Sequence, residues 1–172
     1  MSHLSMYDAS VPVFVRQLKS LSAILDKAEA HCSAKKIDPA VMAGQRLIAD
    51  MFPLSRQVQV ATDFAKGTTA RLAGVEPPAW EDNEKTFAEL KARIQKTIDF
   101  VSGFTTDKIN GSEGRDVTIK LRGNPVTFKG QPYLLMWSLP NFYFHMTSAY
   151  AILRANGVEL GKGDFMGPLP GA

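Results

Sequence analysis

Two polar side chains lie four residues apart in the most aromatic stretch of the chain, LPNFYFHMTSAY, residues 139–150. They are Asn141 and His145, and His145 is one of three histidines in 172 residues. On a helix, side chains at this spacing are about 5–6 Å apart at Cβ, so they can converge on one metal ion or small ligand. Because imidazole has a pKa near neutrality, His145 is also a candidate catalytic base. The alternative interpretation is a core histidine hydrogen-bonded to a neighbour.

A third polar candidate lies in the segment RQVQVATD, where Gln57 precedes the apolar Val58. Gln57 can reach inward toward a ligand, although an amide is a poorer metal ligand than an imidazole or a carboxylate. The alternative is a polar residue at the border of a helix. Farther along, Asp63 and Lys66 are expected on a solvated edge.

Other reactive groups give weaker signals. Cys32 is the only cysteine, which excludes an internal disulfide and a cysteine-based zinc cage. It falls on an apolar stripe, so it is expected to be a small buried hydrophobe rather than a nucleophile, although His31 is adjacent. The tail segment LGKGDF lacks the spacing of a phosphate-binding loop, and Lys162 and Asp164 are expected to pair with the protein surface.

Hydrophobic periodicity predicts four helices that would position these residues. Apolar residues recur at spacings of three and four over residues 14–32, 54–72 and 87–101, and the last helix is expected over residues 133–157. In this last helix Pro140 should cause a kink or a restart, because it removes an amide donor. One stripe of the last helix is expected to face the interior: Ser138, Phe142, His145, Ala149 and Ile152.

The segment between the third and last helices changes period. Val117, Ile119 and Leu121 alternate with polar residues before the turn sequence RGNP, which predicts a β-hairpin. Asp82 or Asn83 is expected as the N-cap of the third helix. The tail is rich in glycine and proline and is expected to be irregular. The predicted fold class is all-α, an antiparallel four-helix bundle with a small hairpin before the last helix, forming one domain over residues 1–172.

Composition narrows the function classes. Apolar residues make up 45% of the chain and charged residues 22%, an ordinary globular balance. The net charge of +3 comes from 20 Lys and Arg against 17 Asp and Glu that are scattered along the chain, so nucleic-acid binding is not indicated. No apolar run reaches the ~20 residues of a membrane span, and MSHLSMYDAS does not resemble a signal sequence. A cytoplasmic protein without a membrane partner is expected.

Four segments together carry a family resemblance: MYDASVPVFVRQLKSLSAILDKA, DMFPLSRQVQVATDFAKG, LPNFYFHMTSAYAILRANGVELGK and DFMG. With them the chain resembles an uncharacterised bacterial domain-of-unknown-function family related to the DinB/YfiT-like metalloenzyme superfamily. Typical superfamily members hold a divalent metal with three histidines, one on the second helix and an H-x-x-x-H pair on the last. The resemblance matches His145 to the second histidine of the pair and puts Asn141 in place of the first. Gln57 is the nearest polar residue to the helix-two position.

The resemblance therefore implies a degenerate site, in which His145 and Asn141 would hold a divalent metal such as Zn or Ni only weakly. The leading hypothesis is a small-molecule pocket around Asn141 and His145, with Gln57 as a further ligand-binding residue. One alternative is a non-catalytic structural protein that forms a homodimer, usual in the superfamily, through the aromatic run NFYF. Another is a thiol-dependent transferase, an activity known among relatives. Whether the protein is an enzyme stays open.

Overall fold

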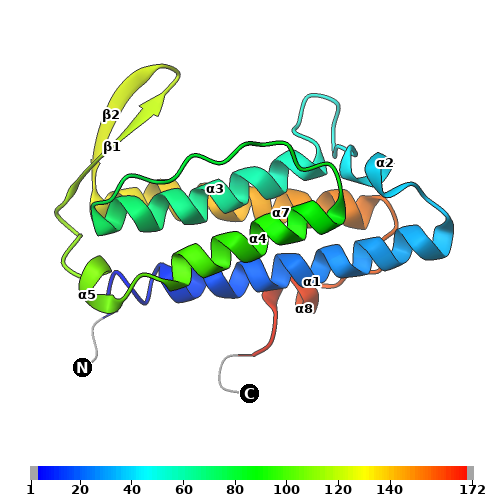
Figure 1. The fold of residues 1–172 in the computed structure, drawn as a ribbon, viewed down its shortest axis with the longest axis horizontal. Coiled ribbons are helices and arrows are strands. Elements are labelled where there is room, and N and C mark those ends of the chain that lie inside the picture. Colours follow the sequence, from blue (N-terminus) through cyan, green and yellow to red (C-terminus); the bar gives the residue numbers. More distant parts are fainter. Residues whose placement is uncertain (1–3, 170–172) are drawn as a thin grey trace.

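The computed structural model describes residues 4–169 and is predominantly helical (Figure 1). Its long helices are α1 (Val11–Lys35), α3 (Leu54–Ala73), α4 (Phe87–Ser102) and α7 (Leu139–Ala155). Its short helices are α2 (Pro39–Ala43), α5 (Thr106–Ile109), α6 (Gly130–Pro132) and α8 (Lys162–Met166). A π-helical segment, η1 (Tyr133–Ser138), leads directly into α7. The predicted count of four thus matches only the long helices of residues 4–169, and α8 lies in the tail that was expected to be irregular.

The β-hairpin lies where the sequence predicts it. Strand β1 (Asp116–Leu121) pairs antiparallel with β2 (Asn124–Lys129), and Leu121 is opposite Asn124. The two residues between them, Arg122 and Gly123, both have positive φ angles, of 50° and 85°. Two consecutive positive φ angles are typical of the tight hairpin turn that matches the twist of the strands. Figure 1 shows the hairpin projecting at one end of the long helices.

The directions of the long helices differ from an all-antiparallel bundle. Helices α1 and α4 run antiparallel, as do α3 and α7, but α3 and α4 run in the same direction (Figure 1). The cause is the extended connection of residues 75–86, here called the strap. It returns along the outside of α3 before α4 begins (Figure 1). The periodicity of each helix does not encode this choice, which depends on the length and path of the connection.

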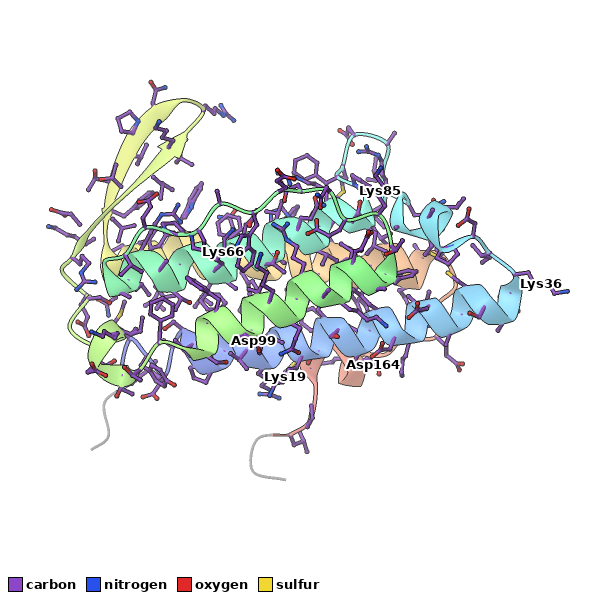
Figure 2. All side chains as sticks on the ribbon, viewed as in Figure 1. Lys19, Lys36, Lys66, Lys85, Asp99 and Asp164 are labelled. Carbon is purple, nitrogen blue, oxygen red and sulfur yellow. The ribbon has the colours of Figure 1, made fainter. Side chains whose placement is uncertain are left out.

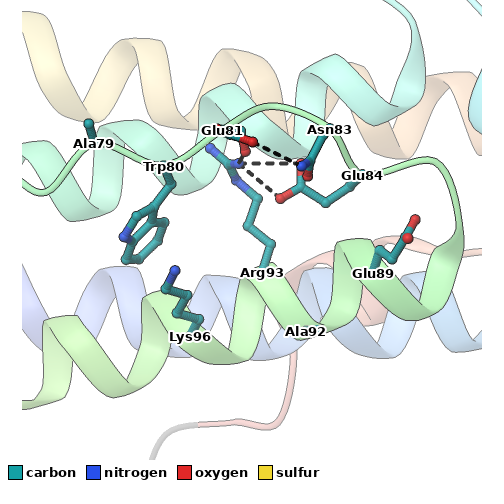
Figure 3. A pocket seen from close by; sticks show the side chains of 9 residues that line it. All are labelled: Ala79, Trp80, Glu81, Asn83, Glu84, Glu89, Ala92, Arg93 and Lys96. Carbon is teal, nitrogen blue, oxygen red and sulfur yellow. Dashed lines mark hydrogen bonds and ion pairs between the residues drawn. The ribbon is translucent and has the colours of Figure 1, made fainter.

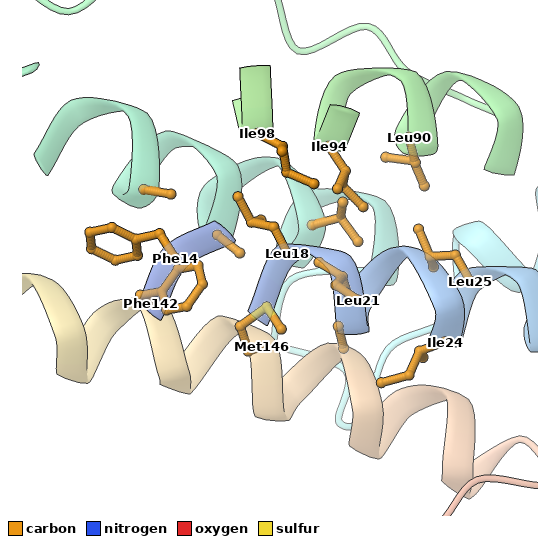
Figure 4. Packing of buried hydrophobic residues seen from close by; sticks show 14 of the residues in the cluster. Phe14, Leu18, Leu21, Ile24, Leu25, Leu90, Ile94, Ile98, Phe142 and Met146 are labelled. Atoms are coloured by element: carbon orange, nitrogen blue, oxygen red, sulfur yellow. The ribbon is translucent and has the colours of Figure 1, made fainter. Parts of the chain in front are cut away.

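The apolar stripes of the long helices meet in one core (Figure 4). Phe14 of α1 packs edge-on against Phe142 of α7, with ring centroids 5.0 Å apart. All members of the predicted interior stripe of the last helix are buried: Ser138, Phe142, His145, Ala149 and Ile152. Each fully buried large apolar side chain contributes roughly 1.5–3 kcal/mol to stability. This tightly packed core fixes the position of the helix backbones, and with them the polar side chains of the stripe.

Helix ends follow local chemistry, with one correction. Gly74, with φ of 75°, ends α3, because glycine adopts the left-handed conformation without a side-chain penalty. The N-cap of α4 is Thr86 rather than Asp82 or Asn83, because Thr86 and Glu89 form a reciprocal capping box. Asp82 is instead paired with Arg93 at 2.9 Å. The N-cap prediction was wrong because the Thr86–Glu89 pair, a few residues further on, caps α4, while Asp82 is held by Arg93 of the same helix.

The last helix changes from π-helical to α-helical just before Pro140 and does not restart there, since Ser138 and Leu139 keep right-handed helical backbone angles and the Leu139 amide donates to the carbonyl of Leu134. Pro140 lies in the first turn of α7, directly after η1. Proline has no amide hydrogen to donate to the preceding turn, and the π-helical turn before Pro140 is the local departure from α-helix geometry expected beside such a residue. None of the helices in the described part of the chain combines the length and hydropathy needed to cross a membrane.

Candidate functional site

His145 and Gln57 are brought together from α7 and α3. His145 is 8% exposed, and its Nδ1 lies 2.7 Å from Gln57 Oε1. The Gln57 Nε2 donates to the carbonyl of Phe52 at 3.2 Å, which orients the amide with its oxygen toward the imidazole. Since an amide oxygen only accepts, Nδ1 must be the donor. The geometry therefore assigns the tautomer in which Nε2 carries the lone pair.

Burial sets the charge of this imidazole. Desolvation lowers the pKa of His145 from 6.5 to about 4, and the nearby positive charge of Arg56 lowers it further in the same direction. The ring of Phe64 stacks on the imidazole with centroids 5.9 Å apart, and Phe144 meets it edge-on at 5.2 Å. His145 is consequently neutral at pH 7, a hydrogen-bond acceptor at Nε2 but a weak proton acceptor for catalysis.

Asn141 does not join this pair through a hydrogen bond in the described structure. Its Nδ2 donates to the carbonyl of Trp137, one turn back, at 2.7 Å. Such local bonds are common for asparagine near a helix start. Of the three residues expected to converge, the structure links His145 with Gln57 and leaves the Asn141 amide bonded to its own helix.

The donor set does not fit a divalent transition metal. His145 offers a single nitrogen, and the Gln57 oxygen already accepts from that imidazole. A stable zinc site needs three or four nitrogen, sulfur or carboxylate donors. Among residues 4–169, no group of three or more His, Cys, Asp or Glu side chains is arranged to hold a metal ion.

A concavity beside this pair lies between α3, the hairpin and η1. We call it the hairpin pocket; its volume is about 240 Å³. Its lining residues are Asp63, Phe64, Arg71, Ile119, Lys120, Leu121, Tyr133 and Trp137. Phe64 connects it with the buried pair, because the same side chain lines the pocket and stacks on His145. The pocket therefore begins one aromatic ring away from His145.

The π-helical segment supplies two of the aromatic walls. Tyr133 is at its start and Trp137 near its end, and the Trp137 ring stacks on Phe128 of β2 with centroids 5.9 Å apart. π-helical turns are rare and occur frequently at functional sites. Sequence reasoning missed the pocket because its walls come from segments far apart in the chain. The available signal was Pro140 directly after YLLMWSL, because a proline inside a helical pattern indicates a local departure from α-helix geometry.

A larger concavity of about 470 Å³ lies under the strap (Figure 3). Its central residue is Arg93, whose side chain is 2% exposed. The guanidinium contacts five residues at distances from 2.8 to 3.0 Å: Thr62, Asp63, Glu81, Asp82 and Glu84. Because its nitrogens are all engaged by the protein, Arg93 is an anchor of the strap rather than a group awaiting a ligand.

Trp80 of the strap lies between two lysines. The Nζ atoms of Lys66 and Lys96 are 4.3 and 4.4 Å from the centroid of its ring system, a cation–π arrangement. Lys66 is also paired with Asp63 at 2.9 Å. Lys66, labelled on α3 in Figure 2, is 6% exposed. The expectation of a solvated edge at Lys66 was wrong because the strap covers this face of α3.

The remaining reactive groups have structural roles. Cys32 is fully buried, and burial, with the negative charges of Asp38 and Glu29, raises the pKa of its thiol. A thiol with a raised pKa is a poor nucleophile. Asp164 in α8 pairs with Lys27 of α1 at 2.6 Å, so this tail residue does bind the surface as predicted.

Comparison with known proteins settles the family. Residues 6–166 match the model of a family described as a domain of unknown function, DUF1993. The chain belongs to this family. Among solved structures it is similar to a crystal structure of a DinB family member protein from Shewanella denitrificans, with 41% identity and a TM-score of 0.87. That similarity covers 95% of this chain and 93% of the other. No curated protein matches the chain. The expected relation to DinB proteins is confirmed.

Proposed function

We propose that the protein binds a small molecule in the hairpin pocket, beside the His145–Gln57 pair. The observation that carries this proposal is the pocket itself. Phe64, Tyr133 and Trp137 line a space of about 240 Å³ where a π-helical segment meets α3 and the hairpin. Aromatic walls with a few polar groups are typical of ligand sites.

In this proposal His145 is a positioning residue. Its Nδ1 is held by Gln57 and its ring supports Phe64, which forms part of the pocket wall. The proposed role is binding rather than catalysis, because a buried imidazole with a pKa of about 4 is a weak base. A thiol-dependent transferase would need a metal that these residues do not suit, so it is not part of the proposal.

The chain has two tryptophans, which provides a direct test. In Trp80→Phe, Trp137 is the only remaining tryptophan, and in Trp137→Phe only Trp80 remains. A set of single-ring compounds would be titrated against both variants while tryptophan emission is recorded. Ligands of the hairpin pocket should change the emission of Trp137 and leave that of Trp80 unchanged.

The affinity for these ligands should fall when a residue of the pocket wall is changed and stay the same when a residue elsewhere is changed. By calorimetry, Phe64→Ala should bind the compounds that respond at Trp137 about tenfold more weakly, because it removes an aromatic wall. The matched control is Phe165→Ala, which truncates an aromatic residue of α8 that packs on Tyr150 outside the pocket lining and should keep the wild-type affinity. Equal responses from both tryptophans, or no saturable binding by any compound, would contradict the proposed pocket.

A second candidate function is self-association, favoured by the outer face of the last helix. Residues 133–153 contain no Asp, Glu, Lys or Arg. Met136 is 78% exposed and Phe144 is 56% exposed on this stretch. Uncharged faces with exposed large apolar side chains are typical of protein interfaces. A homodimer through this face is compatible with ligand binding in the hairpin pocket.

Analytical ultracentrifugation at micromolar concentration tests self-association. The wild-type protein should sediment as a dimer and Phe144→Glu as a monomer, since a buried unpaired carboxylate opposes association. Phe52→Glu is the control, because Phe52 is similarly exposed, at 49%, in the loop before α3. A wild-type monomer, or a dimer that survives Phe144→Glu, would exclude this interface.

A further inference from the structure

We propose that Arg71 is the anion-recognising residue of the hairpin pocket, and that the ligand is a small carboxylate attached to a flat apolar ring. The inference rests on the proposed function of the pocket and deepens it by naming the ligand class. Arg71 lies in the last turn of α3 and lines the pocket together with Phe64, Tyr133 and Trp137.

Arg71 differs from the other buried cations of this face in lacking an anionic partner. Arg93 and Lys66 both pair with Asp63 at 2.9 Å. Arg71 is half-buried, and its guanidinium donates to the phenol oxygen of Tyr133 at 3.3 Å. It takes part in no ion pair with the protein across residues 4–169. A guanidinium has five N–H donors in a planar fork, so most of its donor capacity remains for a ligand.

Gly67 leaves space for this guanidinium beside the helix. Gly67 lies one turn before Arg71, and a Cβ built on it would be 2.5 Å from Arg71 Nη1. The other nearest atoms, at 3.6 and 4.0 Å, also belong to the Arg71 guanidinium. Glycine inside a helix costs roughly 0.5–1 kcal/mol relative to alanine, so its presence at Gly67 calls for a reason. The reason in this geometry is space for the arginine.

Among the charged residues that line the pocket, Arg71 is the main cation available to a ligand. Asp63 also lines the pocket, but Arg93 and Lys66 already neutralise it. Lys120 of β1 adds a second positive charge on the hairpin wall. The partial negative charge at the C-terminal end of α3 opposes an anion here, so recognition depends on Arg71 itself.

The size and shape of the hairpin pocket limit the class of ligand that it can hold. The volume of about 240 Å³ is smaller than the roughly 300–1,000 Å³ of sites for drug-sized ligands. It suits a single ring rather than a nucleotide. Arginine pairs with a carboxylate through two parallel hydrogen bonds, and aromatic walls stack on a flat ring. The combination selects a planar monocarboxylate.

Fluorine NMR with para-fluorobenzoate and its neutral analogue para-fluorobenzamide tests the inference on the full-length protein. The carboxylate should bind the wild type at least tenfold more tightly than the amide. Arg71→Gln should remove that preference, and Arg71→Lys should retain part of it. Arg122→Asn is the control for net charge, because Arg122 is exposed at the hairpin turn with a positive φ that asparagine tolerates. It should bind as the wild type does.

Gly67→Ala separates binding from folding. Alanine favours the helix, so the variant should unfold at the wild-type temperature or higher, while its Cβ displaces the Arg71 guanidinium and weakens the carboxylate preference. Equal binding of the two probes with wild-type-like Arg71→Gln would overturn the role of Arg71 and leave the pocket standing. Binding of neither probe, together with no compound responding at Trp137, would overturn the pocket and the inference together.

Discussion

At the scale of single residues, His145 is a neutral hydrogen-bonding core residue that supports a pocket wall. Two contacts fix the place of His145: its Nδ1 bonds Gln57 Oε1, and its ring stacks on Phe64. Burial, with the positive charge of Arg56 acting in the same direction, lowers the pKa of His145 to about 4 and so favours the uncharged imidazole. The charge state of His145 is therefore coupled to folding.

We expect acid to destabilise the fold through His145. Between pH 6.5 and about 4 the unfolded imidazole binds a proton while the buried one does not, so stability is present above this window and is lost as pH falls through it. The loss should be on the order of 2 kcal/mol. Urea unfolding of the wild type at several pH values in this window measures it.

The variant His145→Gln should show a shallower decline in unfolding free energy over that range, since glutamine can still donate to Gln57 but does not titrate. His31→Gln, a histidine substitution in α1, should follow the wild-type curve. An unchanged slope in His145→Gln would mean that another group titrates.

At the scale of elements, Arg93 of α4 ties the strap to α3 and α4. Arg93 is enclosed by carboxylates of the strap and of α3. Lys91, two residues earlier on α4, instead bridges Asp26 and Glu29 of α1 and is 26% exposed. These two cations on one helix allow a matched comparison of buried and exposed ion pairs.

Replacing Arg93 with leucine should lower the free energy of unfolding by about 3 kcal/mol, because it leaves partly buried carboxylates without a partner. Residues 75–86 should also become sensitive to limited proteolysis. Lys91→Leu should cost under about 1 kcal/mol and leave the strap protected. Similar losses in the two variants would contradict the anchoring role of Arg93.

Sequence periodicity predicts the long helices and the hairpin well because each depends on local spacing. The buried stripe containing Phe142 and His145 and the hairpin turn at Arg122 and Gly123 are local features, and the structure agrees with them. The Thr86 N-cap is also local, since Thr86 and Glu89 are three residues apart, and the sequence interpretation overlooked it. The parallel direction of α3 and α4 and the hairpin pocket depend on contacts between distant segments. Periodicity carries no information about such contacts.

At the scale of the whole molecule, the DUF1993 chain retains a fold similar to a DinB protein, and its residues 4–169 hold no donor set suited to a transition metal. Protein purified without a histidine tag should therefore contain well under one zinc or nickel per chain by elemental analysis. Addition of a chelator should leave the unfolding temperature unchanged, since only a bound ion would stabilise the native state. A stoichiometric metal that is lost in His145→Ala would contradict this expectation.

The strap also has a consequence for the order in which the molecule assembles. Because it sends α4 back beside α3, the extensive antiparallel contacts are α1 with α4 and α3 with α7, while α1 and α3 touch little. Consecutive long helices therefore cannot form an antiparallel hairpin as a first folding unit. Folding has to wait for contacts between distant parts of the chain, and we expect it to be slower than that of an up-and-down bundle of similar length.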